Sequence, residues 1–145
     1  MLATCHLPLY TSYMRFLGID YGAKRIGLAL SDTVGEFSYP HLVLENKGIF
    51  RVVDVIAQLC EKEQVTTVVI GESHDYKGKE NPIMKEVHQF VAELAEKIEI
   101  PIAYENETLT SAEAERLQGK NHMHDASAAA IILRSYLERQ KRITT

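Results

Sequence analysis

Three acidic residues stand at places where a folded chain could bring them together. Asp20 follows the apolar run 16–19, Glu107 follows a run that begins at Ile102, and Asp125 begins a stretch with helical periodicity. Carboxylates that converge repel one another, and their pKa values rise unless a divalent cation lies between them. Hard oxygen ligands of this kind suit Mg²⁺ or Mn²⁺. The three residues therefore predict a divalent-metal site, provided that the fold brings them to one place.

Each of these acids also fits a purely structural role. Asp125 stands at a predicted helix start, where aspartate is a common N-cap. Asp20 fits an ordinary turn aspartate, and Glu107, like its neighbour Glu105, fits a solvated loop carboxylate. Only the joint placement of the three residues predicts a site.

The segment after Asp20 is rich in glycine and positive charge. Gly22 and Gly27 flank Lys24 and Arg25, and glycines could let backbone amides approach a phosphate. The segment is not a Walker loop, because no GK[ST] occurs and no GxGxxG leads from a strand into a helix. A tight hairpin with two solvated basic side chains is an equal alternative.

The elements that would position these residues follow from the hydrophobic pattern. Short apolar runs predict five strands, at about 16–19, 26–30, 37–44, 68–71 and 102–104. Apolar spacings of three and four residues predict helices at about 48–62, 82–98 and 125–139. Thr110 with Glu113 predicts a further short helix that ends at Gly119.

This order of elements predicts one α/β domain. The first three strands would form an antiparallel meander, and right-handed crossovers would then extend the sheet in parallel beyond strand one. The expected architecture is a mixed five-stranded sheet with helices on its faces, and ligands in such sheets bind at the carboxyl ends of strands. We expect residues 1–13 to form a flexible extension and residues 14–145 to form the domain. Because Met14 directly precedes the first strand, we hypothesise that translation begins there.

Composition and charge limit the class of protein. The 145 residues are 46% hydrophobic and 25% charged, which is typical of globular rather than disordered chains. No apolar stretch approaches the roughly 20 residues that a membrane span needs, so we expect no membrane partner. Two cysteines without a CxxC pattern suit a reducing, cytoplasmic location. The net charge of −4 is unlike the basic footprint of most nucleic-acid-binding proteins.

Four motifs carry a resemblance to a known family. They are GIDYGAKRIGLALSD at 18–32, VIG at 69–71 with Gly78 and Pro82, NETLTSAEA at 106–114, and DASAAAIIL at 125–133. Together they span about residues 14–138, nearly the whole chain. They are similar to the motifs of the YqgF family of Holliday junction resolvases, which have an RNase H-like fold.

The resemblance implies a metal-dependent endonuclease whose catalytic and metal-binding carboxylates are Asp20, Glu107 and Asp125. It implies a structured nucleic acid as substrate, either four-way DNA junctions or precursor 16S ribosomal RNA. The expected chemistry is two-metal phosphodiester hydrolysis, with Asp20 bridging both ions. Basic residues of the turn and loops are expected to hold the nucleic acid, namely Lys24, Arg25, Lys77, Lys79, Arg116 and Lys120.

Departures from the family pattern leave other functions open. Asn106 and Thr108 replace the Asp and Arg of the usual Asp-Glu-Arg motif, and Glu72 and Ser73 replace the Leu and Pro of the usual Gly-Leu-Pro motif. One alternative is a non-catalytic RNase H-like scaffold that binds nucleic acid or ribosome precursors. Another is a fragment of an actin-like ATPase, because 18–22 also resembles the first phosphate loop of those proteins. They need two such domains, however, and this chain has room for one.

The net negative charge of the chain predicts weak, salt-sensitive binding of nucleic acid. A homodimer or another partner would strengthen this binding.

Overall fold

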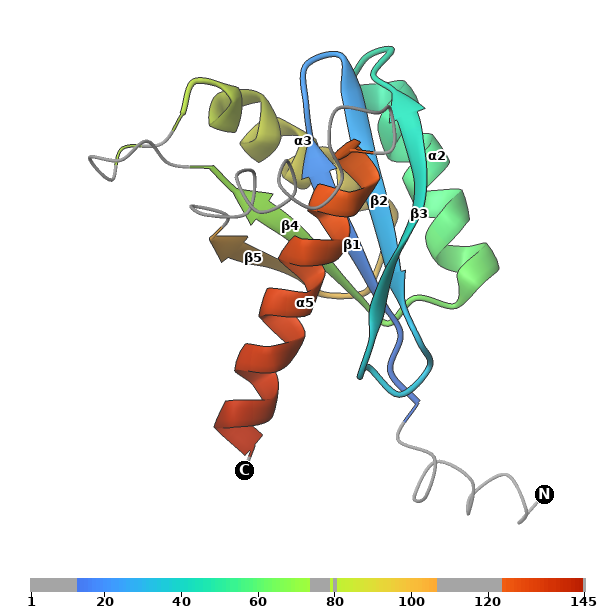
Figure 1. Ribbon diagram of the computed structural model, residues 1–145. Helices are drawn as coiled ribbons and strands as arrows, with labels where there is room; N and C mark the ends of the chain where they lie inside the picture. Colours follow the sequence, from blue (N-terminus) through green and yellow to red (C-terminus); the bar gives the residue numbers. More distant parts are fainter. Residues whose placement is uncertain (1–12, 74–78, 80, 107–123, 145) are drawn as a thin grey trace, which may run out of the picture.

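A five-stranded sheet forms the centre of the computed structural model, which describes residues 13–73, 79, 81–106 and 124–144 (Figure 1). The strands are β1 (Phe16–Tyr21), β2 (Arg25–Ser31), β3 (Ser38–Glu45), β4 (Thr67–Glu72) and β5 (Ile102–Asn106). The helices in these ranges are α2 (Ile49–Glu63), α3 (Ile83–Lys97) and α5 (His124–Thr144). The short helix expected between Thr110 and Gly119 lies outside the described residues.

The strand order β3-β2-β1-β4-β5 confirms the expected mixed sheet. β1 pairs with β2, and β2 with β3, in antiparallel fashion, which is the predicted meander. β4 lies parallel to β1 on one side and to β5 on the other. The carboxyl ends of β1, β4 and β5 therefore lie at the same edge of the sheet.

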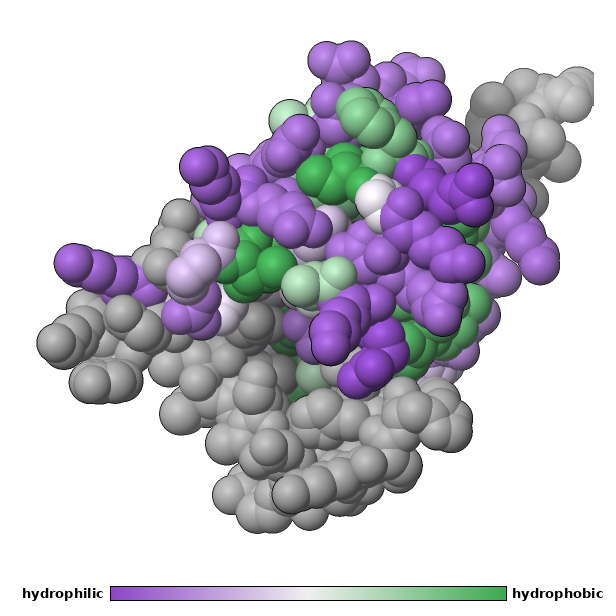
Figure 2. Space-filling model, turned by 90° about the horizontal axis from the view of Figure 1, so that it is seen from above, coloured by the Kyte–Doolittle hydropathy of each residue, from purple (hydrophilic) through white to green (hydrophobic). Residues whose placement is uncertain are grey.

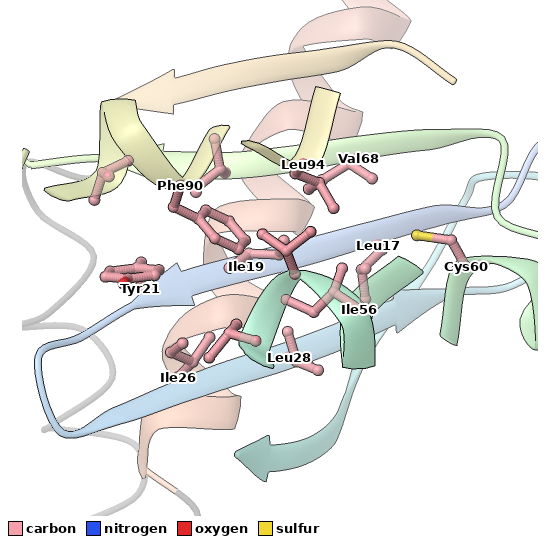
Figure 3. Close-up of a cluster of buried hydrophobic side chains, with 14 of the residues drawn as sticks. Leu17, Ile19, Tyr21, Ile26, Leu28, Ile56, Cys60, Val68, Phe90 and Leu94 are labelled. Atoms are coloured by element: carbon pink, nitrogen blue, oxygen red, sulfur yellow. The ribbon is translucent and has the colours of Figure 1, made fainter. Parts of the chain in front are cut away.

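One face of the sheet packs on α2 and α3 around a large apolar core (Figure 3). In β1 the alternate residues Leu17, Ile19 and Tyr21 point into this core. The two helices present buried stripes at helical spacing, made of Val52, Val53, Ile56 and Cys60 in α2 and of Met84, Val87, Phe90 and Leu94 in α3. Each fully buried Leu, Ile or Phe side chain stabilises the fold by about 1.5–3 kcal/mol.

The other face of the sheet is covered by α5, as Figure 1 shows. The helix packs on the alternate set of strand residues, and the shared cluster is Phe16, Ala29, Val69, Ala129, Ile132, Leu133 and Leu137. Small side chains at Ala29 and Ala129, together with Gly18, let the helix lie close to the strands. The apolar spacing that predicts this helix also predicts its buried stripe, namely Ala129, Ile132, Leu133, Tyr136 and Leu137, and the structure confirms it, with Tyr136 half-buried at the edge. The helix runs to Thr144, five residues beyond the expected end at 139.

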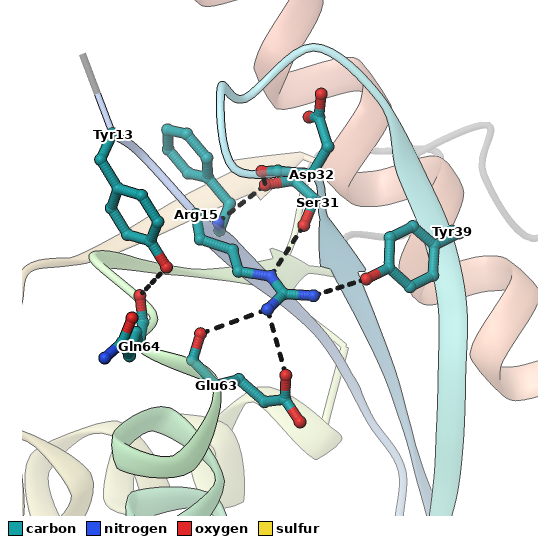
Figure 4. Close-up of polar contacts among 8 residues, drawn as sticks. Tyr13, Arg15, Ser31, Asp32, Tyr39, Glu63 and Gln64 are labelled. Atoms are coloured by element: carbon teal, nitrogen blue, oxygen red, sulfur yellow. Dashed lines mark hydrogen bonds and ion pairs between the residues drawn. The ribbon is translucent and has the colours of Figure 1, made fainter. Parts of the chain in front are cut away.

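A polar cluster ties the amino-terminal end of the sheet together (Figure 4). The Arg15 guanidinium donates to the Ser31 carbonyl oxygen at 3.0 Å and to the Tyr39 hydroxyl at 2.6 Å. It also forms an ion pair with Glu63 at 3.1 Å. Arg15 thereby joins the start of β1 to β2, β3 and the last turn of α2, at the opposite end of β1 from Asp20.

No helix in the described ranges has the length and apolar character that crossing a membrane requires.

Candidate active site

Asp20 lies at the carboxyl end of β1, the central strand of the sheet. It stands opposite Gly27 of β2, and its side chain is partly exposed. Side chains alternate along a strand, so Asp20 belongs to the same face as Phe16 and Gly18, the face that α5 covers. The carboxylate is therefore directed to the α5 side of the sheet at its open edge.

The helix α5 crosses β1 in the antiparallel sense. The rings of Phe16 and Tyr136 lie 5.8 Å apart between centroids, whereas Gly18 lies against Ala129 and Leu133. Two residues further along β1, the contact on α5 therefore lies about one helical turn closer to the amino-terminal end of the helix. Two strand residues span about 6.6 Å and one helical turn about 5.4 Å, so we expect the next step to bring Asp20 level with the first turn of α5.

The first turn of α5 contains Asp125, the third acid of the expected site. Its backbone is helical, and its side chain lies outside the described part of the structure. Glu107 follows directly after the last residue of β5, Asn106, and it too lies outside the described residues. Within the described ranges, no three or more His, Cys, Asp or Glu side chains are grouped so as to hold a metal ion.

Glu105 is buried, and its interpretation as a solvated carboxylate is wrong. Only 6% of the residue is exposed, and it lies on β5 opposite Gly71 of β4. The Ser135 hydroxyl donates to its Oε2 at 2.8 Å, and the Arg139 guanidinium donates to its Oε1. Both partners stand one turn apart on α5, so a side chain of β5 is paired with the helix that also carries Asp125. The alternation of side chains along β5 could have predicted this burial. Ile102 and Tyr104 pack on the side of α2 and α3, so Glu105 faces the side of α5.

The turn 22–25 joins β1 to β2 and carries Lys24 and Arg25, of which Arg25 is also the first residue of β2. Both are exposed. The turn is a tight hairpin, because a Cβ added to Gly22 would lie 2.4 Å from the Arg25 carbonyl oxygen. The Asn46 side chain donates to the Gly22 carbonyl oxygen at 2.9 Å, and the Asn46 backbone N–H donates to the Lys24 carbonyl oxygen at 2.9 Å. The hairpin reading of this segment is confirmed.

A buried tyrosine links the same turn to α3. The Tyr21 hydroxyl donates to Glu86 Oε2 at 2.6 Å, and only 7% of Tyr21 is exposed. Burial, followed by the hydrogen bond to Glu86, raises the pKa of Tyr21 to about 12. Sequence reasoning missed this contact, because nothing in the pattern relates two residues that lie 65 positions apart.

Of the four other predicted nucleic-acid contacts, only Lys79 lies in the described ranges. Lys79 is exposed, whereas three further basic residues lie outside the described ranges: Lys77, Arg116 and Lys120. The residues that flank 74–80 are joined, since the Asn81 backbone N–H donates to the Ser73 carbonyl oxygen at 3.0 Å and the two side chains are hydrogen-bonded. Figure 2 shows the molecule from above, where hydrophilic side chains cover most of the described surface.

Comparison with known proteins decides the family. A model of the RuvX family, described as Holliday junction resolvase, matches residues 14–139. The chain belongs to this family. A relative from Syntrophomonas wolfei is 33% identical over 133 residues, which cover 86% of this chain and 94% of the relative. A relative from Syntrophus aciditrophicus is 35% identical over 133 residues, which cover 86% and 89%. Both relatives carry the name "Putative pre-16S rRNA nuclease".

Solved structures show the fold of this RuvX-family chain. Thermus thermophilus RuvC in complex with a Holliday junction substrate has a TM-score of 0.61 and 15% identity, over 89% of this chain and 96% of that one. Fowlpox virus resolvase with Holliday junction DNA has a TM-score of 0.57 and 12% identity, over 88% and 99%. The expected RNase H-like fold is confirmed by these RuvC-like resolvases.

Proposed function

We propose that this RuvX-family chain is a divalent-metal-dependent endonuclease that hydrolyses phosphodiester bonds in structured nucleic acid. The observation that supports the proposal is the antiparallel crossing of α5 over β1, in which Tyr136 lies against Phe16 and Ala129 lies against Gly18. One further step along this crossing leads from Asp20 toward the first turn of α5. Family membership supports the same conclusion. Asp20, Glu107 and Asp125 are the proposed catalytic and metal-binding residues.

The residues on these elements suit a divalent cation. Asp20 is partly exposed at the open edge of the sheet, and the two other proposed ligands are also carboxylates. A set of hard oxygen ligands favours Mg²⁺ or Mn²⁺ over softer metals. When bound, such ions activate a water molecule and stabilise the leaving oxygen of the phosphodiester.

The exposed cations of the β1–β2 turn are the proposed phosphate-binding groups. Lys24 and Arg25 follow Asp20 by four and five residues on a turn that two hydrogen bonds from Asn46 hold in place. Phosphate neutralisation by such side chains supplies most of the affinity of a nucleic-acid complex and makes it salt-dependent. Because the whole chain carries a net charge of −4, we expect weak binding that falls steeply with salt.

The names of the relatives suggest two substrates. Two curated relatives are named for precursor 16S ribosomal RNA, and the solved resolvases hold Holliday junction DNA. Both are structured nucleic acids with a phosphodiester backbone. We therefore propose this class as the substrate, and the experiment below compares the two members directly.

The test is cleavage of a four-way DNA junction and of a precursor 16S rRNA fragment, side by side, in Mg²⁺, Mn²⁺ or EDTA. The proposal predicts cleavage of one of them that requires metal and is lost in Asp20→Asn. Asp54→Asn is the matched control, because Asp54 is an exposed α2 residue paired with Lys97 on the opposite face of the sheet. Cleavage by Asp20→Asn at the wild-type rate would contradict the proposal.

A non-catalytic scaffold is the second candidate, and the departures at Asn106 and Thr108 favour it. It predicts binding of the same nucleic acids without cleavage in either metal. Binding with no cleavage by wild-type protein would therefore replace the nuclease proposal with the scaffold.

A further inference from the structure

One asparagine holds both ends of the cationic turn. Asn46 follows the last residue of β3, and it lies beside the β1–β2 turn that carries Lys24 and Arg25. Its side-chain amide donates to the Gly22 carbonyl oxygen at 2.9 Å, and its backbone N–H donates to the Lys24 carbonyl oxygen at 2.9 Å. A single residue just after the meander therefore binds the carbonyl groups on both sides of Ala23.

The orientation of the Asn46 amide follows from its other contacts. Its Oδ1 accepts a hydrogen bond from the Gly48 backbone N–H at 3.1 Å. The Nδ2 group, which can only donate, is thereby directed to the Gly22 carbonyl oxygen and to Glu86 Oε2 at 3.4 Å. Both acceptors suit an amide N–H and would repel a second oxygen.

Glu86 joins this asparagine to the core. Its Oε2 accepts from the Tyr21 hydroxyl at 2.6 Å as well as from Asn46. Glu86 lies in the first turn of α3, and the Tyr21 ring packs on Phe90 of the same helix with centroids 5.0 Å apart. The cationic turn is thus connected by hydrogen bonds to the first turn of α3, and the Tyr21 ring continues this connection by packing on the fully buried Phe90.

The network has a consequence for phosphate binding, because it holds the backbone from which the exposed side chains of Lys24 and Arg25 extend. The backbone of the turn sets where Lys24 and Arg25 start. Tyr21 is also the residue after Asp20, so the same network fixes the turn relative to the carboxylate. A preorganised turn avoids the entropy cost of ordering these groups when the ligand binds.

We propose that Asn46 and Glu86 are positioning residues that hold the turn 22–25 in the geometry in which Lys24 and Arg25 bind the nucleic-acid backbone. This inference rests on the proposed function. The two residues act through the turn and do not themselves contact the ligand.

The test measures binding of a labelled four-way DNA junction and of a labelled precursor 16S rRNA fragment to the full chain in EDTA, over a series of salt concentrations. The reference is the double variant Lys24→Ala/Arg25→Ala. Loss of two phosphate contacts should reduce the slope of log K against log salt by about 1.8. Asn46→Asp replaces the donating amide with a carboxylate beside Glu86 and Gly22. We expect it to weaken binding about tenfold at low salt and to lower the slope toward that of the double variant.

Three further variants separate positioning from loss of folding. Tyr21→Phe keeps the ring on Phe90 and removes only the hydroxyl, and Glu86→Gln keeps the size of the side chain. Both should lower the slope of log K against log salt, as Asn46→Asp does. Far-UV circular dichroism and the thermal midpoint show that both variants are folded. Glu63→Gln is the matched control, because it breaks the ion pair with Arg15 at the far end of the sheet. It should lose stability and keep the wild-type slope.

The outcomes distinguish the two proposals. If the Lys24→Ala/Arg25→Ala protein keeps the wild-type slope, the turn does not bind phosphate and that part of the proposed function is wrong. If the double variant loses slope while folded Asn46→Asp, Tyr21→Phe and Glu86→Gln proteins keep it, the positioning role is overturned and the proposed function stands.

Discussion

Gly18 of β1 lies directly against Ala129 of α5. A Cβ added to Gly18 would lie 2.9 Å from the Ala129 carbonyl oxygen and 2.9 Å from Leu133 Cβ. This close approach, together with the Phe16–Tyr136 ring contact, defines how α5 crosses the central strand. The relative placement of Asp20 and the first turn of α5 depends on it.

Gly18→Ala tests this packing. Because the obstructing groups are helix backbone and a Cβ, the helix must shift as a whole. We expect a loss of about 1–3 kcal/mol in the free energy of unfolding, the usual cost of overpacking, measured by urea denaturation. We also expect metal-dependent cleavage to fall more than the unfolded fraction explains, because the first turn of α5 moves relative to Asp20.

Gly35→Ala is the control for Gly18→Ala. Gly35 has a positive φ of 72°, and an added Cβ would lie 2.9 Å from the Phe16 ring. The substitution should cost stability at the amino-terminal end of the sheet and leave cleavage by the folded protein unchanged. Equal losses of activity in the two variants would show that the α5 crossing has no special role.

The Glu105–Arg139 pair should be strongly coupled. Arg139→Ala leaves a buried carboxylate that still accepts a hydrogen bond from the Ser135 hydroxyl but has lost its ion-pair partner, and a buried charge without its ion pair is costly. Since the Arg139 side chain is 47% exposed, we expect a loss of about 1–3 kcal/mol rather than the larger cost of a fully buried pair. Urea denaturation of the single variants and of Arg139→Ala/Glu105→Gln gives the coupling energy. Strict additivity of the two losses would contradict the pairing.

Much of the fold could be predicted from local patterns. Apolar spacing alone predicts the hairpin, the meander and the helices over 48–62 and 82–98. It also predicts which face of each strand and helix is buried. Parallel placement of β4 between β1 and β5 follows from the handedness of crossovers. The carboxyl-end location of Asp20 was predictable for the same reason.

The contacts that hold the site were not predictable in this way. Glu105 finds Ser135 and Arg139 at separations of 30 and 34 residues, and Tyr21 finds Glu86 at 65. Such pairs depend on how a helix is rotated over the sheet, and hydrophobic periodicity fixes that rotation only to about one helix face. The sequence therefore predicted a solvated side chain for Glu105, which is in fact buried against Ser135 and Arg139.

Cys60 predicts a pH dependence of stability. Burial raises the pKa of its thiol from 9.0 to about 11, so the folded protein holds the proton more tightly than the unfolded chain. The resulting stabilisation is complete below about pH 9 and is lost as the pH rises toward 11.

The comparison of Cys60 with Cys60→Ala isolates this effect, in a Cys5→Ser background. The alanine variant is less stable at neutral pH because a buried group is lost, and that difference should shrink between about pH 9 and 11. Other titrating groups, Tyr21 included, are common to both proteins and cancel. Urea denaturation across this range checks the prediction, and a constant difference would contradict it.

Metal-induced stabilisation shows whether Asp20 and the first turn of α5 hold a divalent metal between them, as proposed. The thermal midpoint is measured in increasing Mg²⁺ or Mn²⁺ for wild type, Asp20→Asn, Asp125→Asn and the control Asp54→Asn. A ligand that binds only the folded state stabilises it by about 2.7 kcal/mol at a hundred times its Kd. We predict that the midpoint of wild type and of Asp54→Asn rises with metal, and that this rise is lost in both Asp20→Asn and Asp125→Asn. An equal rise in all four proteins would contradict the account.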